Sequence, residues 1–175
     1  LFTAPMVHAI DEIGTRIVSE ERSPGLAVAV VEDGRIVYAR GFGNAQIDHH
    51  TRFDAETQTY IGGVSESFTA AALLLLQQDG KLKLSDSVVK YVPELTAASK
   101  VTVSELLSHT SGLADCTHAQ GFPDQTHTIK MQQLISALNA LQPQAPPGTA
   151  FARNICNDLL AGLIIERVSG VPLSD

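Results

Sequence analysis

The sequence contains no tryptophan, and aromatic residues make up only 5% of it. A surface that stacks nucleic-acid bases or sugars needs several aromatic rings, so the composition argues against one. Basic residues are also scarce: the chain has 12 Lys and Arg but 19 Asp and Glu, which gives a net charge of −7. A nucleic-acid footprint needs a basic patch, and no Lys/Arg cluster occurs, so nucleic acid is not an expected partner.

No apolar run approaches the roughly 20 residues that a membrane-spanning helix needs. The chain also lacks a basic segment followed by an apolar stretch near its start, so we expect no signal peptide within it. What remains is ordinary for a globular protein: 44% apolar and 18% charged residues in a chain of 175. That length is enough for one domain with a hydrophobic core.

The chain has two cysteines, Cys116 and Cys156, which form no C-x-x-C motif. They could be two buried thiols, one disulfide or one reactive thiol. Two unpaired structural thiols are the preferred interpretation, because free cysteine is among the most buried residue types. The spacing of Cys116 and His118 alone is too little to indicate zinc, so neither a metal site nor a cofactor is expected.

The first sixty residues predict a helix followed by a β-hairpin. Apolar residues recur at helical spacing over Ala4–Glu20. Two β-rich runs, Gly25–Glu32 and Arg35–Gly43, are joined by Asp33-Gly34, a strong two-residue turn signal. The first run is apolar almost throughout, which predicts a strand buried on both faces. The polar segment 44–60 predicts a loop.

A second apolar helix is predicted from about Val64 to Gln78. Gly62-Gly63 precede it, where the backbone can bend sharply, and Asp79-Gly80 follow it as a helix-end signal. The four leucines from Leu73 leave this helix apolar nearly all round, so we expect it to be buried.

The rest of the chain predicts short helices joined by turns. A turn-rich connector covers 82–95, and Thr102 to Glu105 form a capping-box pattern that starts a helix reaching Leu107. Segment 115–127 predicts a polar loop. Further helices are expected over Met131–Leu141, before a proline-rich loop, and over Leu159–Val168, ended by Gly170.

The segment YIGGVSESFTAAALLLL resembles I-G-S-x-S-K-x-F-T-A-A-x-L, which starts a buried helix in serine beta-lactamases, penicillin-binding proteins and family VIII esterases of the class C branch. Four more strings resemble this superfamily in the right order: GLAVAVVEDGRIVYARGFG, LKLSDSVVKYVPEL, VTVSELLSHTSGL and PPGTAFARNICNDLLAGLIIERVSG. The resemblance implies an α/β (α+β) fold, a partial beta-lactamase/transpeptidase-like structure. It has an N-terminal helix, an antiparallel hairpin and a mostly helical region.

The same resemblance implies one domain over 1–175 that is incomplete at its C-terminus. Its helix-and-sheet portion would be 1–62 and its mainly helical portion 63–175. A protein that follows this family would be periplasmic or secreted.

The resemblance also implies that no catalytic group of the family is intact. The nucleophilic serine falls on Gly63 and its base lysine, three residues on, falls on Glu66. The tyrosine and asparagine of the Y-x-N motif fall on Arg153 and Ile155, and no K-T-G occurs. The candidate pocket residues are Gly63, Ser65, Glu66, Arg153, Asn154 and Ile155.

Other serines are poor replacements for the nucleophile. Ser87 and Lys90 fit S-x-x-K literally, but they lie in the connector. Ser65 lies two positions after the nucleophile site, roughly 200° around the helix, and should point away from the pocket. Neither Ser65 nor Ser67 has a lysine three residues later.

Three hypotheses for the function follow. The chain is a catalytically degenerate family member kept for a small-molecule ligand or a partner. Alternatively it is an active hydrolase of esterase, beta-lactamase or D-amino-peptidase type, acting through a residue such as Glu66, or an inactivated form of one. Thirdly, it is a half-domain completed by a second chain, a swapped dimer or a missing C-terminal half.

The substitutions at the family's lysine and tyrosine positions give one geometric prediction. Glu66 and Arg153 bring a carboxylate and a guanidinium to two positions that converge on the nucleophile in the family, and Gly63 leaves room between them. We therefore expect an ion pair, since the planar guanidinium suits a carboxylate. The alternative is that the two side chains extend separately to solvent in an opened cleft. A carboxylate held in an ion pair would be a poor general base.

Overall fold

The computed structural model describes residues 1–20, 23–48, 50–120, 122 and 129–173. It divides into two compact units, Leu1–Tyr60 and Ile61–Asp175, which are described separately below. This division lies close to the predicted change from a helix-and-sheet portion to a helical portion after residue 62. The single domain expected over the whole chain stays a prediction.

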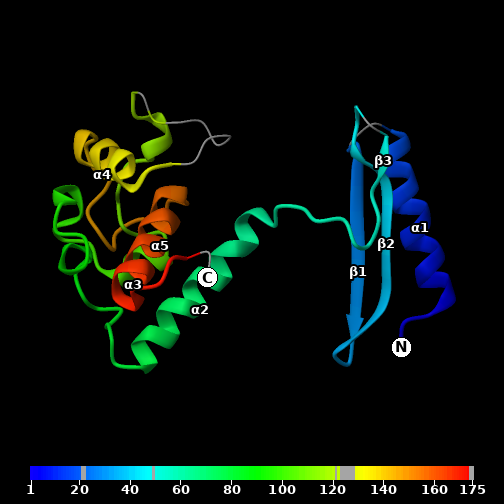
Figure 1. The fold of residues 1–175 in the computed structure, drawn as a ribbon, viewed down its shortest axis with the longest axis horizontal. Helices are drawn as coiled ribbons and strands as arrows, with labels where there is room; N and C mark the ends of the chain where they lie inside the picture. The colour runs from blue at the N-terminus through cyan, green and yellow to red at the C-terminus, as the bar shows by residue number, and fades with distance from the viewer. Residues whose placement is uncertain (21–22, 49, 121, 123–128, 174–175) are drawn as a thin grey trace. The chain divides into compact units, whose positions relative to one another are not determined.

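The first unit is a helix beside a small antiparallel sheet (Figure 1). Its elements are α1 (Ala4–Ser19), β1 (Gly25–Glu32), β2 (Arg35–Gln46) and β3 (Thr51–Arg52). The strand order is β1-β2-β3. Asp33 and Gly34 both have positive φ, 49° and 74°, which suits a two-residue hairpin turn and confirms the predicted hairpin.

Helix α1 lies close to β2 because Gly14 has no side chain. A Cβ at this position would lie 2.7 Å from the ring of Phe42. The Tyr38 hydroxyl donates to Asp11 at 2.6 Å, and Arg40 pairs with the same carboxylate at 2.7 Å. These contacts hold the helix against one face of the hairpin.

The expectation that β1 is buried on both faces is wrong. Its residues alternate between half-buried and exposed, and Ala27, Ala29 and Val31 are exposed. Among the described residues of this unit, α1 is the only helix available to cover the sheet, so one face of β1 stays open.

The second unit is mainly helical (Figure 1). Its elements are η1 (Gly62–Val64), α2 (Ser65–Gln78), η2 (Val88–Lys90), η3 (Thr96–Ala98), α3 (Val103–Leu107), η4 (Cys116–His118), α4 (Met131–Ala140) and α5 (Ile155–Ser169). The core lies around α5, where Leu160 and Ile164 are fully buried with Leu73 of α2 and Leu106 of α3. None of the helices in the described part of the chain is both long and apolar enough to cross a membrane.

The prediction that α2 is buried nearly all round is also wrong. Leu73 and Leu76 are buried, but Phe68 and Leu75 are 68% and 61% exposed. Within this unit α2 packs mainly on α5, so one face of the helix is covered and the apolar residues on its other face are not.

Helix starts follow the capping residues. The predicted capping box is present, because Thr102 accepts from the Glu105 backbone and Glu105 accepts from the Thr102 backbone. Helix α5 begins at Ile155, before the predicted Leu159, since Asn154 caps it by accepting from the Cys156 N–H at 2.9 Å. The predicted loop at 115–127 contains the short helix η4, and residues 121 and 123–127 lie outside the described part.

Candidate functional site

The family's nucleophile position lies in the short helix η1, directly before α2. A Cβ added to Gly63 would lie 2.8 Å from Nη2 of Arg153 and 3.3 Å from Oε1 of Glu66. The three positions that the sequence brings together therefore meet in the structure. The first turn of α2 supplies Glu66, and the segment just before α5 supplies Arg153.

The predicted ion pair between Glu66 and Arg153 is confirmed. Nη2 of Arg153 donates to Oε1 of Glu66. The Arg153 side chain is 65% exposed and that of Glu66 is 31% exposed, so the pair lies at the surface of the unit. The carboxylate that takes the place of the family's base is thus already engaged by a cation.

The other candidate residues lie around this pair in different ways. Ile155 is the first residue of α5 and Ser65 is the first residue of α2, and both residues are exposed. Lys90, the partner of Ser87 in the literal S-x-x-K, is bound to Asp86 at 2.8 Å. That hydrogen bond raises the pKa of Lys90, so its ammonium is unsuited to act as a base.

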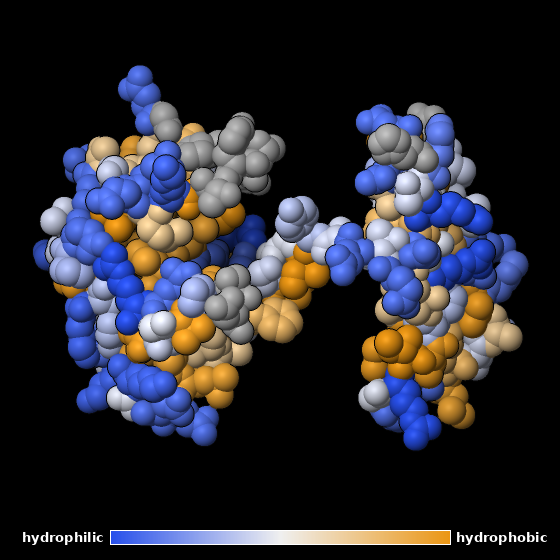
Figure 2. All heavy atoms as spheres, in the orientation of Figure 1, coloured by the Kyte–Doolittle hydropathy of each residue, from blue (hydrophilic) through white to orange (hydrophobic). Residues whose placement is uncertain are grey.

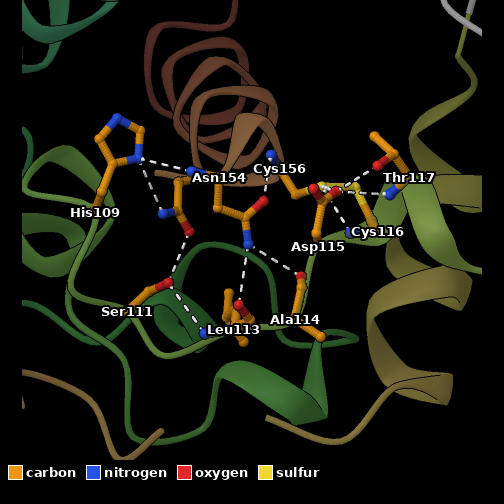
Figure 3. Close-up of a disulfide and its surroundings, with 10 residues drawn as sticks. His109, Ser111, Leu113, Ala114, Asp115, Cys116, Thr117, Asn154 and Cys156 are labelled. Atoms are coloured by element: carbon orange, nitrogen blue, oxygen red, sulfur yellow. Dashed lines mark hydrogen bonds between the residues drawn. A yellow bond between two sulfur atoms is a disulfide. The ribbon is translucent and has the colours of Figure 1, made fainter. Parts of the chain in front are cut away.

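Asn154 is buried, and its side chain is directed at Leu113 and Ala114 (Figure 3). Its Nδ2 donates to the backbone carbonyls of Leu113 and Ala114, both at 3.0 Å, while its Oδ1 caps α5. The side chain is therefore occupied in fixing the start of α5, and with it the position of Arg153.

Two further residues belong to the site and were not predicted as part of it. His109, only 11% exposed in its side chain, places Nε2 at 3.7 Å from Oε2 of Glu66. Asp158, one turn into α5, brings a carboxylate oxygen close enough that one atom from each of the three side chains lies within 4.8 Å of the others. No motif links positions 66, 109 and 158, so the sequence offered no signal for this cluster.

Asp158 is the unusual member of the cluster. Its Oδ2 is shielded from solvent and has no hydrogen-bond partner among the described residues. Burial, and then the nearby charge of Glu66, raise the pKa of Asp158 above its ordinary value. A shielded carboxylate oxygen without a partner is rare in folded proteins and calls for an explanation.

The two cysteines form a disulfide, so the preferred interpretation of unpaired thiols is wrong (Figure 3). Cys116 in η4 and Cys156 at the start of α5 are 6.0 Å apart at their Cα atoms. The spacing in sequence could not reveal this, because the fold brings the two segments together. Asp115 lies beside both cysteines, but bonded sulfurs offer no thiolate for a metal ion.

Comparison with known proteins places these observations in a family. The family model described as Beta-lactamase matches residues 8–175. The chain is 32% identical over 143 residues to a putative penicillin-binding protein PbpX of Bacillus subtilis (strain 168), covering 82% of this chain and 35% of that protein. It spans about a third of the length of the curated relatives that it matches.

Comparison with solved structures gives the same relationship. The octameric penicillin-binding protein homologue from Pyrococcus abyssi has a TM-score of 0.81 and 30% identity, over 95% of this chain and 40% of that one. A class C beta-lactamase has a TM-score of 0.79 and 28% identity, over 96% of this chain and 45% of that one. The mixed helical and antiparallel fold matches these structures, and the chain belongs to the Beta-lactamase family.

Proposed function

We propose that this chain is a catalytically degenerate member of its family, whose former nucleophile cleft binds a small molecule without cleaving it. The observation that carries the proposal is the environment of Gly63. A serine side chain at this position would lie beside the Glu66–Arg153 ion pair and not beside a free base. Acyl transfer needs a nucleophile and a group to take its proton. Gly63 offers no nucleophile, and Glu66 is held by Arg153.

Three reagents test this proposal together. A chromogenic cephalosporin, a short-chain p-nitrophenyl ester and a fluorophosphonate probe each report acyl transfer to a serine. We expect no turnover above the uncatalysed rate and no covalent adduct by mass spectrometry. A fluorophosphonate adduct on Ser65 or Ser67 would contradict the proposal.

Restoring the first motif alone should not restore activity. The double variant Gly63→Ser with Glu66→Lys regains S-x-x-K, but Arg153 and Ile155 still occupy the positions of the family's tyrosine and asparagine. The members of a catalytic unit act together, so a partial unit loses most of the rate enhancement. We expect ester turnover by this variant to stay at background in the p-nitrophenyl assay. Turnover well above that of the single variant Gly63→Ser would show that the remaining substitutions matter little.

We also propose that this chain functions together with a second chain or a further segment. The relative from Pyrococcus abyssi is described as octameric, and the chain spans less than half of that structure. Apolar side chains are exposed in both units, including Val31 and Ile36 in the hairpin and Phe68 in α2. A partner that covered them would remove apolar area from water, which is favourable.

The disulfide supports a location in an oxidising compartment. Disulfides persist in secreted and periplasmic proteins and are rare in the reducing cytosol. We propose that the protein is exported, in line with the expectation for its family. Intact-mass measurement after alkylation of protein taken from its native source tests this, since free thiols at both cysteines would contradict it.

A further inference from the structure

A small cavity of about 170 Å³ lies in the second unit, and none of the residues that line it belongs to the site around Gly63. Three segments of the chain enclose it: residues 97–101, residues 111–113 and the proline-rich loop at 143–147. Its apolar walls are formed by Ala97, Val101, Leu113, Pro143 and Pro147. An apolar cavity of about 150 Å³ is large enough to hold benzene, so this space suits one small ring or a short branched chain.

Hydrogen bonds hold the segments around the cavity in place. The N–H of Gln144 in the proline-rich loop donates to the carbonyl of Gly112 at 2.8 Å. Asn139 of α4 binds the first segment, because its Oδ1 accepts from the N–H of Ala97 at 3.0 Å. A cavity whose walls are already fixed loses little conformational entropy when a ligand enters it.

The hydroxyl on the cavity wall is already engaged (Figure 3). Ser111 donates to Oδ1 of Asn157 at 2.7 Å and accepts from the N–H of Leu113 at 3.2 Å. Ser111 is buried, so its only hydroxyl proton stays with Asn157. This part of the wall therefore offers a ligand no free donor.

Lys100 is the only charged residue among the described residues that line the cavity. It is exposed, whereas Val101 and Leu113 are buried, so the charge lies at the open side and the apolar walls lie deeper. No described carboxylate forms an ion pair with Lys100. Its ammonium is thus available to an anion that binds there.

We propose that this cavity binds a small organic carboxylate, with its ring or branched chain inside and its carboxylate at the ammonium of Lys100. Burial of the apolar part removes its surface from water and supplies most of the affinity. The ion pair lies at the surface, where such pairs contribute little, so it mainly selects carboxylates over neutral molecules of the same shape. This inference goes beyond the proposed function, because it assigns a second site that uses neither Glu66 nor Arg153.

The first test uses the unaltered protein and three carboxylates at constant ionic strength. Benzoate carries one ring, acetate carries none, and diphenylacetate is too large for the cavity. Titrations followed by the backbone amide resonances of Val101 and Leu113 should show saturable binding of benzoate. We expect a dissociation constant of about millimolar for so small a ligand. Acetate and diphenylacetate should bind at least tenfold more weakly.

Variants of lysine then test the role of the charge. Lys100→Gln should weaken benzoate binding about threefold, because it removes an exposed ion pair, and it should leave binding of the neutral analogue benzamide unchanged. Lys83→Gln removes another exposed lysine of the same unit and should leave the binding of both molecules unchanged. Circular dichroism of each variant establishes that it is folded.

Three outcomes would overturn the inference. They are an absence of saturable shifts at Val101 and Leu113, binding of acetate or diphenylacetate as tight as that of benzoate, or equal effects of Lys100→Gln and Lys83→Gln. None of them bears on the proposed function, which the acyl-transfer assays decide separately.

Discussion

At the scale of single residues, the chemistry of this site depends on which partner each carboxylate has. Glu66 has a guanidinium beside it, whereas Asp158 has one oxygen without a partner. The two carboxylates lie close together, so the negative charge of Glu66 disfavours the ionised form of Asp158. The structure maintains this arrangement although it costs folding free energy when Asp158 is ionised.

We therefore predict that Asp158→Asn stabilises the fold at neutral pH. Folding raises the pKa of Asp158 above its ordinary 3.8, so the native state binds its proton more tightly than the unfolded chain does. The ionised carboxyl costs stability at neutral pH, and this cost disappears below the unfolded pKa. Urea unfolding at about pH 7 and at about pH 3 should show a gain at the higher pH only. A loss of stability at neutral pH would mean that Asp158 makes a favourable interaction there.

At the scale of elements, the start of α5 is the most constrained part of the second unit. Asn154 caps it, the disulfide bonds it to η4, and the buried amide of Asn157 joins it to Ser111. Arg153 precedes this point directly. The position of the guanidinium beside Glu66 thus depends on one local cap and on two contacts with other segments.

The disulfide should contribute substantially to stability. A bond that closes a loop of 40 residues removes conformational entropy from the unfolded chain, worth about 2–4 kcal/mol. The double variant Cys116→Ala with Cys156→Ala should unfold at correspondingly lower urea concentration. The unaltered protein with and without reductant provides the matched control, because reduction should reproduce the loss. Identical midpoints in all samples would show that the disulfide adds no stability.

The pattern of residues in the sequence predicted most helices and strands. The differences between the predicted and the observed bounds have physical reasons. The bounds of β1 and the hairpin turn followed from an apolar run and from Asp33-Gly34, which are local signals. The start of α5 was placed too late, because apolar periodicity begins only at Leu159 while a side-chain cap at Asn154 sets the true start.

The candidate site was predictable in part for a similar reason. Family strings located Gly63, Glu66 and Arg153, and the chemistry of their side chains predicted the ion pair. His109 and Asp158 could not be found in this way, since only folding brings positions so far apart in sequence together. The disulfide escaped prediction on the same ground.

At the scale of the whole molecule, the open surfaces matter most. Strand β1 pairs with β2 alone in the described part of the chain, which leaves one edge of its backbone without a strand. Apolar surface is visible in Figure 2 at the end of the first unit where β1 and β2 join. Exposed edges and apolar patches of this kind favour association.

We predict that the purified chain associates instead of remaining a monomer. Size-exclusion chromatography with light scattering should give a mass well above 18.6 kDa. A double variant, Val31→Lys with Ile36→Lys, places charges on the exposed hairpin residues and should shift the protein toward the monomer. Gln78→Lys adds a charge at the exposed end of α2 and should have little effect. A monodisperse monomer with cooperative unfolding would count against the proposed partner.

The contact between Arg153 and Glu66 also restricts the mutational paths open to this chain. Gly63→Ser alone would place a Cβ 2.8 Å from Nη2 of Arg153. Glu66→Lys alone would bring an ammonium beside that guanidinium, and Arg153→Tyr alone would leave Glu66 without its cation next to Asp158. The serine requires only the exposed end of Arg153 to shift, whereas each of the other two first steps leaves a charge without its partner. Selection acting on one substitution at a time would therefore favour keeping Glu66 and Arg153 together.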